Sequence, residues 1–316
     1  MSSERVLANL RESLPSRRPQ LLAECRRLGR CSLAALLDGL GMELGEFYRV
    51  AGSWALLQRE LGWVAGVASG GPTVDEERLG RGVGRLLHLD DTDRLSFLLQ
   101  GLAHGQPPVV QSLSGTDRLA LQDALDRLWA CPAFLDELRD LCTLLLERTD
   151  HLAPPLVWDQ PVPLALHARY SRAEIYAAFG LITDTQQTTG QSRVLFDRAT
   201  QCDVFFITLK KSERLFSATT RYNDYAISPW EFHWESQSNT REASATGQRY
   251  IHHRERGSRV LLFVREENKQ GGVTLPFLCL GFAEYVSHEG ERPMAIRWRL
   301  QRPIPGALYP ELAVAV

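Results

Sequence analysis

The sequence predicts a multidomain protein, with an all-α N-terminal domain and an α+β C-terminal domain built on a partly closed β-barrel. Three observations predict this. Residues 1–150 place apolar side chains at helical spacing, residues 151–164 (HLAPPLVWDQPVPL) hold four prolines, and strand-like runs dominate after residue 165. We therefore expect a helical domain at 1–150, a Pro-rich linker packed through Trp158 at 151–164, a β-rich domain at 165–305 and a tail at 306–316.

Helix-start signals recur through the first half of the chain. Thr73 and Glu76 have the spacing of a capping box, in which each side chain satisfies a backbone N–H of the other. Ser114 or Thr116 can start a further helix, and Pro132 suits the first position of the next one. The apolar faces expected for these last two helices are Leu121, Leu125 and Leu128, and Leu135, Leu138, Cys142 and Leu145, respectively.

The second half changes from helical to strand periodicity. Ser171 and Glu174 form another capping-box pattern, and Gly180 suits the position just after a helix, so we expect one helix at about 171–179. In the final strand-like run, Ile296, Trp298 and Leu300 alternate with Arg297, Arg299 and Arg302, which predicts one buried face and one cationic face. The strand-like runs are 194–196, 203–209, 259–266, 277–286 and 295–303.

Charge is distributed unevenly along the chain. The net charge is −2, but residues 1–164 carry 17 Arg and no Lys against 22 acidic residues, whereas residues 165–302 carry 16 Arg and 3 Lys against 15. A positive second half favours a polyanionic partner for that half. The adjacent Lys210 and Lys211 stand out in a chain that otherwise uses arginine.

Several common chemistries have no motif in this sequence. It contains no P-loop, no dinucleotide-binding glycine motif, no H-E-x-x-H zinc motif and no G-x-S-x-G nucleophile elbow. Six cysteines occur without a C-x-x-C pair, so we expect free or buried thiols. No apolar run has the length of a membrane span, and the N-terminus lacks a signal-peptide core. We expect a cytoplasmic, non-catalytic protein without metal, cofactor or membrane contact.

The segment 221–253 is rich in both aromatic and polar side chains. Six of its 33 residues are Phe, Trp or Tyr, interleaved with Asn, Asp, Ser, Gln and Thr. Aromatic rings can stack on a nucleic-acid base while polar groups read its edge. The alternative is that the aromatics fill a small barrel core and the polar groups cap its loops. For the segment as a whole we favour a binding surface, because it reads as too polar and irregular for a core strand.

Four stretches carry a resemblance to a known family. They are LKKSERLFSATTRYNDYAIS, FHWESQSNTREASATGQRYIHH, VLLFVRE and AEYVSHEGERPMAIRWRL. They resemble the domain of unknown function at the C-terminal end of many bacterial DEAD/DEAH-box helicases and of certain modification-dependent (type IV) restriction enzymes. EFYRVAGSW and LGRGVGRLLHLDDTDRL are more loosely similar to the helical region upstream of that domain. No helicase or nuclease motif accompanies them here.

The resemblance, which covers about residues 165–303, implies an SRA/PUA-like fold that recognises 5-methylcytosine in double-stranded DNA. It also implies that the chain is part or partner of a helicase or nuclease system of restriction and antiviral defence. A C5 methyl adds one apolar contact of at most about 1 kcal/mol, so the base must be enclosed, and SRA-like domains do this by base flipping.

The site residues are predicted from residue type and position. Tyr222, Tyr225 and Trp234 are the candidate stacking walls, and Asp224, Asn223 and Gln237 are candidates for contacts with the base edge. A carboxylate such as that of Asp224 can accept from the cytosine N4 amino group. The candidate contacts to the DNA backbone are Lys210, Lys211, Thr220, Arg221, Ser236, Ser238, Arg241 and Arg249.

Three other functions remain open from the sequence. Stacking and phosphate contacts are similar in an RNA-binding or unmodified-DNA module. The helical half could dock a helicase or nuclease partner, with the aromatic residues marking a protein interface. A nuclease using Asp224, Glu235 and Lys210 is a weaker alternative, because the lysine lies upstream of both carboxylates.

Overall fold

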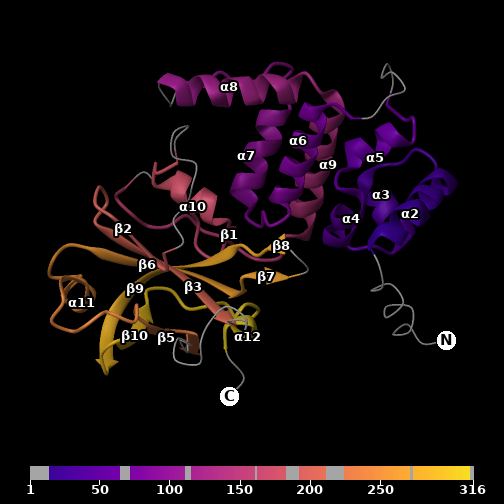
Figure 1. The fold of residues 1–316 in the computed structure, drawn as a ribbon. Coiled ribbons are helices and arrows are strands. Elements are labelled where there is room, and N and C mark those ends of the chain that lie inside the picture. Colours follow the sequence, from indigo (N-terminus) through magenta and orange to yellow (C-terminus); the bar gives the residue numbers. More distant parts are fainter. Residues whose placement is uncertain are drawn as a thin grey trace, which may run out of the picture. The chain divides into compact units, whose positions relative to one another are not determined.

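The computed structural model describes residues 14–64, 72–110, 115–160, 162–182, 192–210, 224–270 and 273–313. The chain divides into two compact units, unit 1 at Met1–Asp150 and unit 2 at His151–Val316 (Figure 1). Unit 1 is helical, and unit 2 is built on a mixed β-sheet. Each unit is described by itself.

Unit 1 contains eight α-helices and one 3₁₀ turn in its described residues. The capping box of Thr73 and Glu76 starts α6, Gly115 starts α8, and Pro132 is the first residue of α9, which confirms three helices expected from the sequence. The elements are α2 (Leu14–Leu28), α3 (Leu33–Leu40), α4 (Leu44–Ala51), α5 (Trp54–Glu60), α6 (Val74–Val83), η1 (Gly84–Leu86), α7 (Thr92–Leu102), α8 (Gly115–Trp129) and α9 (Pro132–Arg148).

A buried carboxylate ties α9 to α5. Glu137 accepts hydrogen bonds from the Ser53 hydroxyl at 2.6 Å and from the backbone N–H groups of Trp54 at 2.6 Å and Ala55 at 3.0 Å. These backbone groups belong to the first turn of α5, where N–H groups have no partner within the helix. Burial raises the pKa of Glu137, and the hydrogen bonds offset part of this effect. Glu137 therefore caps α5 from a neighbouring helix.

Unit 2 is built on an eight-stranded sheet. The order is β2-β3-β6-β9-β10-β5-β4, with β1 paired to β9, and among the described strands only the β3–β6 pair is parallel. The strands are β1 (Arg169–Tyr170), β2 (Val194–Asp197), β3 (Cys202–Lys210), β4 (Tyr225–Ser228), β5 (Glu231–Glu235), β6 (Arg259–Glu267), β9 (Phe277–Glu289) and β10 (Ala295–Leu300), beside the hairpin of β7 (Lys269–Gln270) and β8 (Val273–Thr274). The sheet ends at β2 and β4, so a barrel is not confirmed.

The sheet nevertheless curls strongly. Phe205 of β3 and Trp234 of β5 stack with their ring centroids 4.0 Å apart, although three strands lie between β3 and β5 in the sheet. Strands nearly 5 Å apart could not place two such rings in contact in a flat sheet. The concave face therefore closes around its own side chains.

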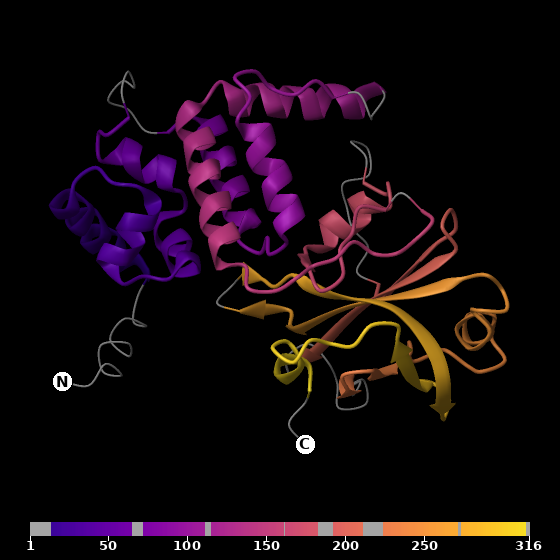
Figure 2. The same ribbon diagram turned by 180° about the vertical axis from the view of Figure 1, so that it is seen from behind.

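Helices cover both faces of the sheet (Figures 1 and 2). α10 (Arg172–Ala178) packs on the convex face through Ile175 and Tyr176, and its capping box confirms the predicted start at Ser171. α11 (Ala245–Ile251) and α12 (Tyr309–Leu312) contribute Tyr250 and Leu312 to the concave face. Two apolar cores therefore lie back to back across one sheet.

The Pro-rich segment and the C-terminal residues both pack against this sheet. Trp158 contacts the rings of Phe179 and Phe282, as expected from the sequence, and Leu164 is buried. A Cβ on Gly281, which has φ +79°, would lie 2.6 Å from a methyl carbon of Leu166, so only glycine allows this close approach. Residues 151–164 and α12 are therefore structural parts of unit 2.

The strand predictions divide into confirmed and missed elements. In β10, Ile296, Trp298 and Leu300 are buried while Arg297 and Arg299 are exposed, and Arg302 beyond the strand is exposed too, which confirms the predicted alternation. The expectation that residues 221–253 contain no core strand is wrong. β5 lies inside the sheet between β10 and β4, with Phe232 and Trp234 fully buried.

Candidate nucleic-acid interface

Four aromatic side chains form a cluster on the concave face, which we call the inner aromatic cluster: Phe205, Trp234, Tyr250 and Trp298. Tyr250 of α11 meets Phe205 edge-on at 5.3 Å and Trp234 at 5.6 Å. All four are fully buried. The indole N–H groups of Trp234 and Trp298 find no hydrogen-bond acceptor among the described residues. Buried indole N–H groups are usually paired, so this cluster carries unused donors.

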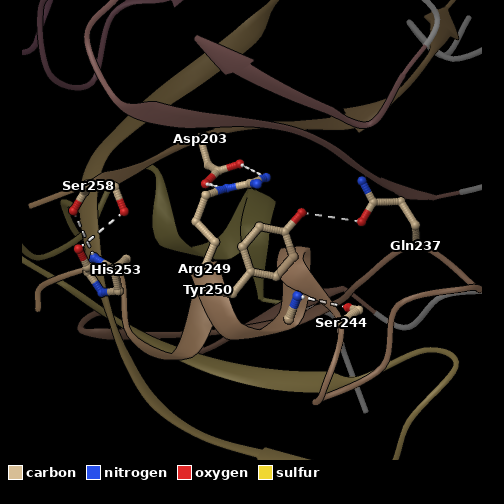
Figure 3. A network of polar contacts seen from close by, with 8 residues as sticks. Asp203, Gln237, Ser244, Arg249, Tyr250, His253 and Ser258 are labelled. Atoms are coloured by element: carbon tan, nitrogen blue, oxygen red, sulfur yellow. Dashed lines mark hydrogen bonds and ion pairs between the residues drawn. The ribbon is translucent and has the colours of Figure 1, made fainter. Parts of the chain in front are cut away.

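A buried ion pair holds α11 against β3 (Figure 3). Arg249 donates from Nε to Asp203 Oδ2 at 2.7 Å and from Nη2 to Oδ1 at 2.9 Å, and it lies 4.1 Å from the ring centroid of Phe196. Burial raises the pKa of Asp203, and the Arg249 charge offsets part of this. Burial would lower the pKa of Arg249, but its hydrogen bonds with Asp203 outweigh that effect and raise it. A bidentate pair fixes both side chains in one geometry.

A second buried pair joins the two edges of the sheet. Arg193, just before β2, donates to Asp224, just before β4, at 2.7 Å. The other oxygen of Asp224 accepts from the backbone N–H of Glu235 at 2.9 Å, and the Asp224 side chain is fully buried. The Arg193 guanidinium also lies 5.9 Å from the Trp234 ring centroid. The opening between β2 and β4 is therefore spanned by side chains.

Gln237 lies beside Tyr250 of the inner aromatic cluster (Figure 3), and its side chain is partly exposed. Its side-chain oxygen accepts from the hydroxyls of Tyr250 and Thr240, each at 3.3 Å. Among the described residues its amide nitrogen donates to no protein group. Such an amide can donate two N–H groups to a ligand while its oxygen is held by the hydroxyls of Tyr250 and Thr240. This combination suits recognition of acceptor atoms on the edge of a base.

The turn after α11 is held by a buried histidine (Figure 3). His253 Nδ1 faces the Ser258 carbonyl at 3.3 Å, and Nε2 accepts from the backbone N–H of Tyr285 at 3.1 Å. This arrangement fits a neutral ring with its proton on Nδ1, and burial lowers the His253 pKa in agreement.

The described residues contain no group of three or more His, Cys, Asp or Glu side chains that could hold a metal ion.

The predicted pocket residues fall into four groups. Gln237 lies where a ligand can reach it. Asp224 and Trp234 are buried, since Asp224 is engaged by Arg193 and Glu235 and Trp234 stacks on Phe205, so neither is placed as a base-edge reader or a stacking wall. Tyr225 lies on the convex face of the sheet, where its ring stacks on that of His233 with the centroids 4.8 Å apart. Tyr222 and Asn223 lie outside the described residues.

The predicted phosphate-contacting residues divide into those held by other protein groups, those that are exposed and those whose side chains are not described. Arg249 is committed to Asp203, and Ser236 is buried, where its hydroxyl accepts from the backbone N–H of Met294 at 2.9 Å, so both depart from the predicted role. Ser238 and Arg241 are exposed and remain compatible with it. Lys210 ends β3, and its side chain is not described. Lys211, Thr220 and Arg221 lie outside the described residues.

Arg193, Asp203 and Tyr250 were not predicted as part of the site. Only Asp203 carries a sequence signal: a carboxylate inside an apolar run (CDVFFITL) must be paired if the strand is buried. Arg193 and Tyr250 reach the site through contacts with residues 31 and 13 positions away, respectively. No local pattern specifies such contacts.

Comparisons with known proteins bear on unit 2. Residues 164–312 match the family described as Domain of unknown function (DUF3427). A solved structure, Arabidopsis thaliana SUVH6 in complex with SAM, is 11% identical with a TM-score of 0.30, over 71% of this chain and 38% of that one. This chain therefore spans well under half of SUVH6, and a likeness so distant carries no inference. The search of curated proteins found no match.

No helix among the described residues has the length and apolar composition to cross a membrane.

Proposed function

We propose that unit 2 is a DNA-binding module that recognises a modified cytosine of the 5-methylcytosine type, with the base flipped out of the duplex. The observation that carries this proposal is the Gln237 amide, whose oxygen is held by Tyr250 and Thr240 and whose nitrogen has no protein acceptor among the described residues. An amide of fixed orientation can bind the acceptor edge of an extruded base. The sequence resemblance supports the same assignment, and the family match at 164–312 covers nearly the same residues.

The energetic cost of flipping a base favours a pocket that lies next to aromatic side chains. Unstacking a base costs a few kcal/mol, which edge hydrogen bonds and stacking must offset. Tyr222 and Asn223 remain the predicted contributors to stacking and edge recognition. Asp224 supports the site indirectly, because it fixes Glu235 at the end of β5, one residue before Ser236 and two before Gln237.

We further propose that the chain carries no catalytic centre of its own and works as part or partner of a helicase or nuclease. In the nuclease alternative, Asp224 would have to bind a metal ion. Both of its carboxylate oxygens instead accept from protein donors. A cleavage assay with Mg²⁺ or Mn²⁺ and modified DNA tests this directly, since any turnover by the purified chain would overturn the proposal.

The experiment for the site compares Gln237→Leu with wild type on matched duplexes with and without one 5-methylcytosine. Leucine keeps roughly the size of the side chain and removes both the oxygen acceptor and the NH₂ donor of its amide. We expect the preference for the modified duplex to fall about fivefold, or roughly 1 kcal/mol, with weak nonspecific binding retained. Gln301→Leu is the matched control, because Gln301 is exposed. Unchanged discrimination in Gln237→Leu would place the pocket elsewhere.

A further inference from the structure

We infer that Arg292, with Arg241 beside it, binds the phosphate backbone of the DNA duplex next to the proposed pocket. The inference rests on the proposed binding of DNA by unit 2, and it adds Arg292 to the contact predicted at Arg241. Arg292 lies in the turn between β9 and β10 (residues 290–294), and Arg241 lies in the loop after β5 (residues 236–244), which we call the Gln237 loop. Both arginine side chains are exposed.

Hydrogen bonds join the Gln237 loop to the β9–β10 turn. Ser236 donates its backbone N–H to the Met294 carbonyl at 3.0 Å, and its hydroxyl accepts from the Met294 N–H at 2.9 Å. Further along, the Arg292 N–H donates to the Thr240 carbonyl at 3.0 Å. Thr240 is also the residue whose hydroxyl donates to the Gln237 amide oxygen. Arg292 is therefore bonded directly to a residue that orients the proposed base-reading amide.

The backbone of Arg292 has a conformation that arginine rarely adopts. Its φ is 60°, in the left-handed region that only glycine enters without steric cost. The same turn uses a glycine at its other left-handed position, Gly290, where φ is 64°. Strained backbone positions occupied by other residues concentrate at sites that bind ligands. Because the Arg292 side chain is exposed, its presence at such a position points to a ligand rather than to packing.

Neither Arg241 nor Arg292 forms an ion pair or a side-chain hydrogen bond in the part of the chain that the structure describes. Two glutamates lie close by, but other groups hold them. Glu291 Oε1 accepts from the backbone N–H of Glu242 at 2.9 Å, and Glu242 Oε2 lies 3.5 Å from His288 Nε2. The N–H donors of both guanidinium groups are therefore available to a phosphate, which can accept two of them in parallel.

The backbone at Arg241 is fixed from the other side by α11. The Arg241 carbonyl accepts from the Ser244 hydroxyl at 2.6 Å. A Cβ on Gly247 of α11 would lie 2.1 Å from the same carbonyl oxygen, so only glycine allows the loop to pack this closely. A cation on a fixed backbone loses less conformational freedom when it binds. The two arginines thus occupy neighbouring, ordered positions.

The test measures the salt dependence of binding of the full chain to matched DNA duplexes with and without one 5-methylcytosine. Arg292→Gly relieves the left-handed backbone and removes the cation, so we expect a thermal midpoint no lower than that of wild type. The slope of log affinity against log salt concentration should fall in magnitude by about 0.9 on both duplexes, and by about 1.8 in Arg292→Gly/Arg241→Gln. Arg292→Lys keeps the charge and should keep most of the slope.

Gln201→Gly is the matched control, because Gln201 also has a positive φ, 51°, and carries no charge. Arg49→Ala, at an exposed arginine of unit 1, controls for net charge, and both controls should keep the wild-type slope. The inference is overturned if Arg292→Gly keeps that slope, if Gln201→Gly or Arg49→Ala loses as much, or if the wild-type chain binds neither duplex. Equal wild-type affinity for the two duplexes would contradict only the reading of modification, and a reduced slope in Arg292→Gly would then still support the phosphate contact.

Discussion

Arg193 and Asp224 join the two edges of the sheet in unit 2, with Nη2 of the arginine donating to Oδ2 of the aspartate at 2.7 Å. The sheet has no backbone ladder between β2 and β4 in its described residues, so this pair, together with the Phe205–Trp234 stack, holds the curl. The Asp224 side chain is fully buried and also accepts from the Glu235 backbone. Its first role is therefore to maintain the shape of the site.

The first prediction concerns Asp224→Asn. The substitution removes the charge of a fully buried carboxylate that binds Arg193, so we expect a loss of about 3 kcal/mol in the free energy of unfolding. Urea denaturation followed by tryptophan fluorescence measures it. Glu284→Gln is the control, because it removes an exposed ion pair with Arg254 that is worth less than about 1 kcal/mol. Equal, small losses in both variants would show that the edges are held by other contacts.

The second prediction concerns the bidentate pair of Arg249 and Asp203. Arg249→Met leaves a buried carboxylate unpaired and should cost about 3–5 kcal/mol of stability, while adding Asp203→Leu should restore a large part of the loss. A double-mutant cycle by urea denaturation gives the coupling energy. Strictly additive effects of the two substitutions would contradict the pairing.

The third prediction concerns contacts to the DNA backbone. Lys210→Ala/Lys211→Ala should weaken binding to all duplexes about equally and reduce the magnitude of the salt slope by about 2, since each phosphate contact contributes about 0.9. Anisotropy titrations over a range of salt concentrations measure the slope. Arg49→Ala, at an exposed position of unit 1, is the control. A loss confined to the modified duplex would assign the lysines to the base pocket.

The fourth prediction concerns pH. His167 is buried with φ 64°, and burial, aided by His151, lowers its pKa from 6.5 to about 4. Between these two values the unfolded chain binds a proton that the folded chain does not, so stability falls as the pH falls through this window and is fully present above about 6.5. At about pH 5 the loss is about 2 kcal/mol.

His167→Asn removes that titration, and asparagine tolerates positive φ. The variant should therefore lose less stability than wild type between about pH 7.5 and about pH 5 in urea denaturation. His104→Asn, at an exposed histidine, should behave as wild type does. The same pH dependence in His167→Asn and wild type would assign the effect to other groups.

Local signals in the sequence predicted the local structure well. The capping boxes at Thr73 and Ser171 start helices as expected, because the interaction lies within four residues. The alternation in β10 is also confirmed, since a strand buried on one face repeats every two residues. β5 was missed although EFHWE alternates in the same way, because the polar residues around it masked the pattern.

Long-range pairing could not be predicted from the sequence. Asp224 was expected in the base pocket from its residue type, but whether a carboxylate faces a ligand or a buried arginine depends on a partner 31 residues away. Arg249 was expected at a phosphate, and its partner lies 46 residues away. Gln237 was predicted to contact the base edge and stays a prediction; its side chain is partly exposed, and its support by Tyr250 is a tertiary feature of α11.

The most direct test of the central claim is a fluorescence-anisotropy titration of the full chain at fixed salt. It compares matched DNA duplexes with and without one 5-methylcytosine and includes an RNA duplex as control. Our account predicts that the modified duplex binds about fivefold more tightly, or roughly 1 kcal/mol, than the unmodified one, and that RNA binds more weakly than both. Equal affinity for the two DNA duplexes, or tighter binding of RNA, would contradict it.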